Sequence, residues 1–270
     1  MHFATLVSGS SGNATVVGHK NRNFLVDCGV SLKALLHNLE LIDISSSEIE
    51  GIIVTHEHKD HIKGIGPVAR KLKIPIYATA GIWEEMTSSL GKIDEQQKVI
   101  ISDQFSCAGL DVQVFPTSHD SRESYGFRIQ SPETGSFQSK ALGIATDTGI
   151  ITEEMNRYLK GCDGLVVEAN HDGERLWNGR YPWYLKKRIS GDRGHLENKQ
   201  LAEGLLEWIQ ENTERVVLAH LSEENNTPEL ALSTILKILK NSKVAKENPE
   251  LRLRVAPRHT PHELIILGED

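Results

Sequence analysis

Six consecutive positions, 56–61, contain three histidines and one aspartate, and this cluster constrains the fold more than any other feature of the chain. It lies within VTHEHKDHIKG, directly after GIIVT at 51–55, an apolar β-branched run that predicts a buried strand. Imidazole and carboxylate groups are good ligands for Zn²⁺, Mn²⁺ or iron, and the cluster holds no thiol. We therefore expect a fold that presents a metal site at the end of a strand.

Other candidate ligands also stand where a predicted strand stops. His119 follows VQVFPTS, Asp147 follows LGIAT and His220 follows VVLA. Strand ends on one rim of a layered sheet can converge on a common site that the sheet holds rigidly from below. We expect these three side chains to join the cluster at 56–61.

The spacing within the cluster predicts two ions rather than one. His56 and His58 are two residues apart and can face one ion in an extended segment, whereas a turn after His58 would direct Asp60 and His61 elsewhere. Two ions about 3.5–4 Å apart are typical of phosphoester hydrolases, and Asp147 is a natural bridge between them. The alternative is a closed zinc site that only stabilises the fold, although such sites usually contain cysteine.

The pattern of apolar residues predicts a single α/β domain over 1–270, with two sheets sandwiched between helices. A β-rich first part is followed by a part that mixes strands and helices. Helical spacing is found at 31–41, 62–72, about 195–210 and 228–240, and strands are expected at 3–7, 14–18, 24–28, 51–55, 74–79, 110–120, 125–130, 141–149, 164–172, 215–222 and 251–256.

The composition indicates which partners and which cellular compartment are expected. The net charge of −7 gives no general signal for nucleic acid or an anionic membrane. Three widely spaced cysteines argue against a disulfide framework and favour a reducing compartment. Neither a signal peptide nor an apolar run of membrane-spanning length is found, so we expect a cytoplasmic protein with no membrane partner.

One segment is basic, although the chain as a whole has a negative net charge. Between Arg175 and His195 the sequence has six Lys or Arg residues and one acidic residue, Asp192, together with four aromatic residues. Basic residues interleaved with aromatic ones suit backbone phosphates and stacked bases. We predict that Arg188 and Arg193 contact substrate; the alternative is a solvated amphipathic helix whose aromatic side chains fill the core.

Several further residues are candidates for the site. His195 follows a glycine and is expected to open a helix, where it could meet a phosphate or protonate a leaving oxygen; the alternative is a capping histidine without a catalytic part. His171 could orient a ligand or touch substrate. SGSSGN at 8–13 has the composition of a phosphate-binding loop, so Ser8, Ser11 and Asn13 are predicted to line the site.

THEHKDH resembles the H-x-H-x-D-H signature of the metallo-β-lactamase superfamily. VDCG at 26–29, SHD at 118–120, TDTG at 146–149 and AHLS at 219–222 are similar to the other motifs of that superfamily, in the expected order. The resemblance implies an αββα four-layer sandwich. It also implies that one ion is held by His56, His58 and His119 and a second by Asp60, His61 and His220, with Asp147 between them.

SGSSGN, EANHD at 168–172, YPWYLKKRISGDRGHLEN at 181–198 and HLSEENNTP at 220–228 resemble the YycJ/WalJ group of this superfamily. That resemblance implies a dinuclear phosphodiesterase, a 5′-to-3′ exodeoxyribonuclease that uses a metal-bridging hydroxide, with Asp60 and His195 in catalytic roles. Zinc or manganese is expected, and iron fits the same ligands. Glu197 departs from the group, in which a serine is expected, and adds a negative charge near the substrate.

Two other functions fit the same residues. One is a small-molecule hydrolase of the same fold, acting on a cyclic phosphodiester, a thioester or a lactone. The other is a metal-loaded module that holds DNA without cutting it. The intact set of candidate ligands and the candidate acid, His195, argue against the second.

Overall fold

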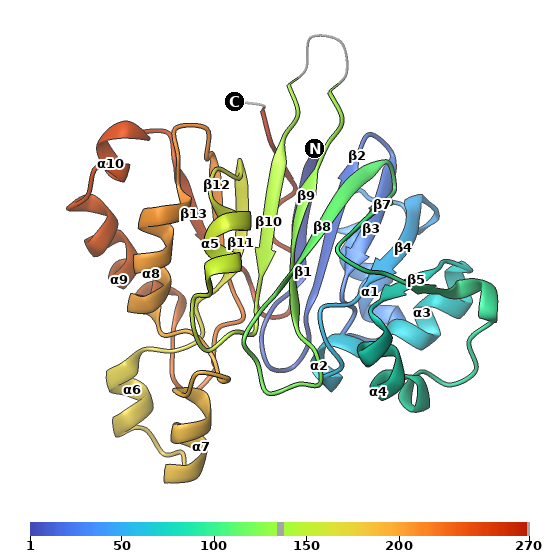
Figure 1. Cartoon of the computed structure of the whole chain (residues 1–270), viewed down its shortest axis with the longest axis horizontal. Helices are drawn as coiled ribbons and strands as arrows, with labels where there is room; N and C mark the ends of the chain where they lie inside the picture. Colours follow the sequence, from blue (N-terminus) through green and yellow to red (C-terminus); the bar gives the residue numbers. More distant parts are fainter. Residues whose placement is uncertain (134–137, 269–270) are drawn as a thin grey trace.

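The computed structural model describes residues 1–133 and 138–268, and it arranges their strands in two seven-stranded sheets (Figure 1). The first sheet has the order β14 (Ile265–Ile266), β1 (His2–Val7), β2 (Ala14–His19), β3 (Arg22–Val26), β4 (Ile49–Ile53), β5 (Ile76–Ala78), β6 (Lys98–Ile100). The second has the order β13 (Arg252–Val255), β12 (Arg215–Ala219), β11 (Gly164–Glu168), β10 (Ala141–Ala145), β9 (Tyr125–Gln130), β8 (Leu110–Pro116), β7 (Gln104–Cys107).

Each sheet contains a run of parallel strands, and this determines where the loops meet. β3 to β6 are parallel in the first sheet, and β10 to β13 are parallel in the second. β8 runs in the same direction as β10, because both are antiparallel to β9. The carboxyl ends of these strands therefore share one edge of their sheet, where ligands usually bind.

Helices cover the outer face of both sheets. In Figure 1, α1 (Leu32–Glu40), α3 (Ile65–Leu72) and α4 (Ala80–Leu90) lie beside the first sheet, whereas α5 (Glu153–Leu159), α8 (Asn198–Trp208) and α9 (Pro228–Lys240) lie beside the second. The shorter helical segments are α2 (Lys59–Ile62), α6 (Gly173–Asn178), α7 (Trp183–Ile189), α10 (Val244–Glu247) and two 3₁₀ turns at Ser46–Glu48 and Glu95–Gln97.

Three apolar layers separate these four layers of secondary structure. The central one contains Phe24 and Ile53 of the first sheet and Phe127 and Val166 of the second. The outer two join each sheet to its own helices. Burial of these side chains is the main force that holds the layers together. The predicted αββα sandwich is confirmed.

The helix predictions hold where local signals are strong. α9 matches the predicted range 228–240, because Thr227 accepts a hydrogen bond from the N–H of Leu230 and Pro228 fits the first helical position. The helix predicted at 62–72 instead begins at Ile65, after the separate helix α2. Gly64 stands between them, and a Cβ there would lie 1.8 Å from the carbonyl oxygen of Val30.

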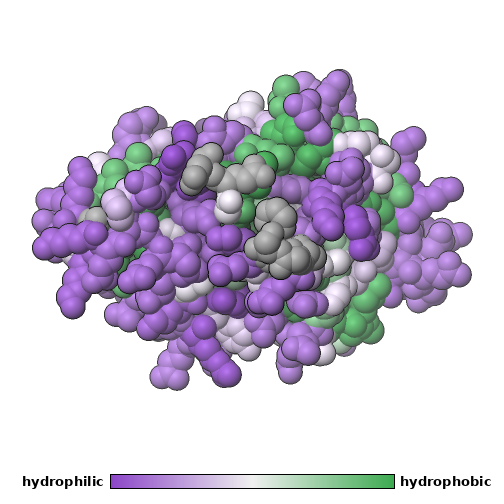
Figure 2. Space-filling view, turned by 90° about the horizontal axis from the view of Figure 1, so that it is seen from above, coloured by the Kyte–Doolittle hydropathy of each residue, from purple (hydrophilic) through white to green (hydrophobic). Residues whose placement is uncertain are grey.

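The face seen from above Figure 1 is mainly hydrophilic, with hydrophobic residues gathered in smaller patches (Figure 2). Within residues 1–133 and 138–268, no helix has both the length and the apolar character needed to cross a membrane.

Candidate metal centre

The predicted ligands meet where strands of both sheets end. His56 lies three residues after β4, His119 three after β8, Asp147 two after β10, and His220 directly after β12. Asp147 and His220 have positive φ angles of 59° and 54°, and so does Asp27, with 60°, directly after β3. Such backbone angles are unfavourable for residues other than glycine and cluster at functional sites.

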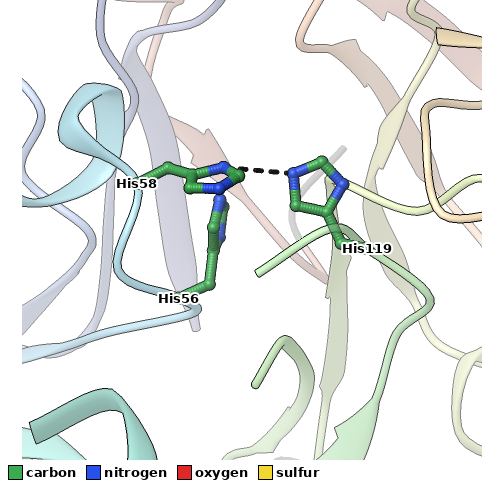
Figure 3. A group of neighbouring side chains, drawn as sticks. All are labelled: His56, His58 and His119. Atoms are coloured by element: carbon green, nitrogen blue, oxygen red, sulfur yellow. Dashed lines mark hydrogen bonds between the residues drawn. The ribbon is translucent and has the colours of Figure 1, made fainter. Parts of the chain in front are cut away.

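Three histidines form the first group. His56 and His58 come from the loop after β4, and His119 faces them from the loop after β8 (Figure 3). Nε2 of His119 is 3.2 Å from Nδ1 of His58. Each of the three offers one ring nitrogen within 4.8 Å of the others, a spacing that a single ion could bridge.

Asp60, His61 and His220 form the second group, and their ligand atoms also lie within 4.8 Å of one another. Nε2 of His61 is 3.5 Å from Oδ2 of Asp60, and Nε2 of His220 is 3.6 Å from the same oxygen. One carboxylate oxygen therefore faces two imidazole nitrogens, one from α2, which follows β4 of the first sheet, and one from the residue directly after β12 of the second.

Asp147 lies between the two groups. Its Oδ2 is 3.3 Å from Nε2 of His61, and its Oδ1 is 3.7 Å from Nε2 of His119. Within the described residues, Asp147 Oδ2, His56 Nε2 and His220 Nε2 are buried without a hydrogen-bond partner. Buried polar atoms are rarely left unsatisfied, so a set of nitrogen and oxygen donors that converges in this way fits divalent cations.

The charge of the site also fits a cation. Burial alone would lower the pKa of His220, but the carboxylates of Asp147, Asp60 and Glu168 raise this pKa to about 10. Burial would raise the pKa of Asp147, whereas the imidazoles of His220 and His61 hold this pKa well below its usual range. Anionic carboxylates that favour a proton on a neighbouring imidazole would equally favour a divalent ion.

The buried carboxylate of Asp27 supports the ligands from behind. Its Oδ1 accepts a hydrogen bond from the N–H of Thr55 (2.9 Å), and its Oδ2 lies 2.7 Å from both Oγ1 of Thr55 and Nδ1 of His61. Oγ1 of Thr55 is also 3.0 Å from Nδ1 of His56. A hydrogen bond at Nδ1 leaves Nε2 of His61 as the ligand atom.

Glu168 is a site residue that the sequence did not reveal. It ends β11, is fully buried, and places Oε1 2.7 Å from Nδ1 of His195 and 2.8 Å from Nδ1 of His220. Burial would raise its pKa, but His195 and His220 lower it to about 2. The one available signal was an acidic residue at the end of an apolar strand, which is also the first residue of the EANHD motif at 168–172.

The setting of His195 differs from the prediction. α8 begins at Asn198 with Glu197 as its N-cap residue, so His195 lies in the loop before the helix and does not open it. Its side chain is 20% exposed, and its ring centroid is 5.1 Å from that of His119 and 5.2 Å from that of His220. Burial would lower the pKa of His195, but Glu168 raises it.

Glu197, the departure from the expected serine, has a local structural role. Its N–H donates to Oε1 of Gln200 (2.9 Å), as in a capping box at the start of α8. Its carboxylate lies against Gly173, because a Cβ on that glycine would be 2.7 Å from Oε1 of Glu197. The extra negative charge therefore lies at the start of α6.

The residues predicted to bind substrate differ in their contacts and their exposure. Oγ of Ser8 accepts a hydrogen bond from the N–H of His220 (2.7 Å), and Nδ2 of Asn13 lies 3.0 Å from Nε2 of His61. Both therefore touch predicted ligands. Ser11 is exposed. His171 is buried, with Nδ1 unpartnered among the described residues, and burial lowers its pKa to about 4.

The two predicted arginines fasten loops to the centre. Nε of Arg193 donates to the carbonyl oxygen of His119 (2.9 Å), and its Nη2 donates to that of Ser121 (3.1 Å). Arg188 forms an ion pair with Asp120. Both guanidinium groups already have protein partners beside the candidate ligand His119.

The chain resembles proteins of known family and name. The family described as the β-lactamase superfamily domain matches residues 22–221. Exodeoxyribonuclease YycJ of Bacillus anthracis is 38% identical over 241 residues, which cover 88% of this chain and 89% of that protein. Exodeoxyribonuclease WalJ of Streptococcus pneumoniae strain D39 is 36% identical over 241 residues, which cover 88% and 87%.

A solved structure shows the same architecture. The metallo-β-lactamase fold protein YhfI of Bacillus subtilis matches with a TM-score of 0.69 at 15% identity, over 97% of this chain and 99% of that one. The four-layer sandwich is therefore the metallo-β-lactamase fold.

Proposed function

The chain belongs to the β-lactamase superfamily and is a metal-dependent hydrolase, and we propose that it hydrolyses DNA as a 5′-to-3′ exodeoxyribonuclease. The observation that carries this proposal is the pair of adjacent three-residue groups on either side of Asp147. Two similar proteins that cover most of the chain bear the name exodeoxyribonuclease. The polarity rests on the resemblance of the motifs to the YycJ/WalJ group.

We assign two divalent ions to the centre. His56, His58 and His119 would hold one, and Asp60, His61 and His220 the other. Asp147 would contribute one oxygen to each. Zinc or manganese suits these nitrogen and oxygen ligands, and iron fits them as well. When bound, the two ions would neutralise phosphate charge and lower the pKa of a water molecule.

The protein's own residues then orient the ligands and supply a proton. Asp27 and Thr55 fix the rings of His61 and His56 through hydrogen bonds at Nδ1. Glu168 holds Nδ1 of His195, so Nε2 of that ring is the atom that can pass a proton to the leaving oxygen. The raised pKa of His195 favours the protonated form of this ring.

Asp60 has two roles in the proposed site: it is a ligand of the second ion and it supplies negative charge. Its Oδ2 faces Nε2 of both His61 and His220, so it completes the second group. Burial would raise the pKa of Asp60, but the neighbouring imidazoles of His220 and His61 lower it, which favours the anionic carboxylate. Without Asp60, the second ion would lose its one non-bridging carboxylate.

The decisive experiment compares substrates in one assay. Duplex DNA labelled at the 5′ end, the same duplex labelled at the 3′ end, RNA, and bis-p-nitrophenyl phosphate are incubated with Mn²⁺ or Zn²⁺ and with a chelator. We expect mononucleotides from the labelled 5′ end of DNA and none with the chelator. Hydrolysis of the small diester without cleavage of DNA would instead identify a small-molecule hydrolase. DNA binding without hydrolysis of either substrate would identify a non-catalytic module.

We also propose a cytoplasmic location. Cys28, Cys107 and Cys162 are buried free thiols. Unpaired cysteines are usual in reducing compartments.

A further inference from the structure

The segment between His171 and Glu197 leaves the metal centre and returns to it. A β-bridge pairs His171 with Glu197, and the N–H of Asn198 donates to the carbonyl oxygen of His171 (2.9 Å). Between these points the chain forms α6 and α7, which project beyond the lower end of the sandwich in Figure 1. We call Gly173–Ile189 the aromatic hairpin.

Aromatic rings of the hairpin face solvent. Trp177, Trp183 and Tyr184 have 42%, 65% and 74% of their surface exposed. They do not fill a core, so the amphipathic-helix alternative is wrong for these three residues. The ring centroids of Trp177 and Trp183 are 5.2 Å apart, with their planes inclined at 50°. Large aromatic groups usually gain free energy by leaving water, so an exposed group of three indicates a binding surface.

The charge of the hairpin indicates an anionic partner. Within the hairpin the sequence has five Lys or Arg residues and one acidic residue, Glu174. Nζ of Lys187 lies 5.4 Å from the centroid of the Trp183 ring, and among the described residues Lys187 and Arg180 form no ion pair. Lys186 donates to the carbonyl oxygen of Trp177 (2.7 Å) and is less available to a ligand.

The hairpin and the residues directly after it are fastened to the loop that carries His119. Arg188 of α7 pairs with Asp120, and Oγ of Ser118 donates to the carbonyl oxygen of Asp192 (2.7 Å). Nδ1 of His119 lies 3.1 Å from the carbonyl oxygen of Gly194. A strand of nucleic acid that lies on the hairpin would therefore be directed towards the metal centre.

We infer that the aromatic hairpin binds an unpaired segment of the DNA substrate, with bases stacked on Trp183, Tyr184 and Trp177 and phosphates beside Lys187 and Arg180. Stacking on an exposed ring requires the face of a base, and within a duplex, away from its ends, the neighbouring base pairs cover both faces. Sequence-tolerant stacking combined with basic groups is the usual way to hold a single strand. This inference rests on the proposed DNA substrate and specifies its form.

The test measures the binding of a fluorescent single-stranded oligonucleotide with phosphorothioate linkages to the metal-loaded protein. Trp183→Ala/Tyr184→Ala should weaken binding about tenfold or more, because each stacked base contributes substantially. Trp183→Phe/Tyr184→Phe should restore most of the affinity. Ile100→Ala is the matched control, since Ile100 is 70% exposed in β6 and outside the hairpin. Lys187→Gln should lower the slope of log affinity against log salt by about one.

The same variants separate the inference from the proposed function. In the alanine double variant, the rate on DNA with a 5′ overhang should fall much more than the rate on bis-p-nitrophenyl phosphate. If the wild type degrades DNA and the double variant matches it in affinity and rate, the inference is wrong and the proposed function stands. If the wild type hydrolyses only the small diester, both the inference and the proposed function are wrong.

Two further results would overturn the inference alone. One is equal loss of affinity for blunt duplex and single strand. The other is a dimer in light scattering that the double variant converts to a monomer with unchanged DNA binding, which would make the hairpin a contact between copies. A stronger effect on RNA than on DNA would contradict the proposed substrate as well.

Discussion

Oδ2 of Asp27 lies 2.7 Å from Nδ1 of His61, although the two residues are 34 positions apart in the chain. Both groups are buried, and the same oxygen also accepts a hydrogen bond from Oγ1 of Thr55. The contact fixes which nitrogen of His61 faces the centre.

Asp27→Asn should therefore weaken metal binding with little change in shape. The amide would place an N–H group opposite Nδ1 of His61 and favour the tautomer with its proton on the metal-facing nitrogen. We expect an affinity about 10–100-fold lower, measured by competition with a chromogenic chelator. Asp163→Asn is the control, because Asp163 is equally buried but bonds Lys140 and the N–H of Ala141. Equal affinities for both variants would contradict the role of Asp27.

Asp147→Asn should remove the bridge between the two groups. We expect the metal content to fall below two ions per chain and turnover to fall about 100-fold or more, since a bridging ligand contributes more than the residues behind it. Elemental analysis and the DNA assay measure the two effects. Full activity in a sample with verified metal content would refute the assignment.

His195→Ala should show an effect that depends on the leaving group. If His195 supplies a proton, the loss on DNA, whose leaving alkoxide is a strong base, should be about 10²–10⁴-fold. The loss on bis-p-nitrophenyl phosphate should be much smaller, because p-nitrophenolate leaves without a proton. His37→Ala, at an exposed position of α1, is the control. Equal losses on both substrates would assign His195 to metal binding instead.

The three cysteines should be unreactive in the native protein. Burial raises the pKa of Cys28, Cys107 and Cys162 to about 12, compared with about 8.5 for a free thiol. A disulfide reagent at pH 8 should label them slowly in buffer and rapidly in denaturant. Rapid native labelling would show that the thiols are accessible.

The same pKa shifts predict a pH dependence of stability. The folded state favours the neutral thiols, so their contribution is fully present below about pH 8.5 and is lost as the pH rises towards 12. The free energy of unfolding, measured in urea, should therefore fall from pH 8 to pH 10. A Cys107→Ala variant should show a smaller fall over that range, and an identical fall would argue against a contribution from this thiol.

Features determined by local sequence could be predicted. The cluster at 56–61 follows β4 because a β-branched run ends there, and the other predicted ligands stand at strand ends that share an edge. The helix predicted from apolar spacing at 228–240 matches α9, whose start is marked by Thr227 and Pro228. The periodicity of apolar residues and the capping of helices depend on residues only a few positions apart, so both can be recognised from one sequence.

Features that depend on distant contacts could not be predicted. Glu168 looks like any acidic residue after a strand, and its role appears only when His195 and His220 face it. The hydrogen bonds of Arg193 to the carbonyl oxygens of His119 and Ser121 were also hidden in the sequence, and its predicted contact with substrate stays a prediction. Exposure of the hairpin aromatics was equally hidden, because an aromatic residue has the same sequence signal inside a core and on a surface.

The candidate ligands come from both sheets: those at 56–61 follow β4 of the first sheet, whereas His119, Asp147 and His220 follow β8, β10 and β12 of the second. Ions bound there would act as a cross-link between the two halves of the sandwich. Occupancy of the metal site and the stability of the packing between the two sheets would then be thermodynamically linked. Chelation should accelerate amide hydrogen exchange first at the carboxyl ends of β4 and β12, while the opposite end of the central apolar layer keeps its protection.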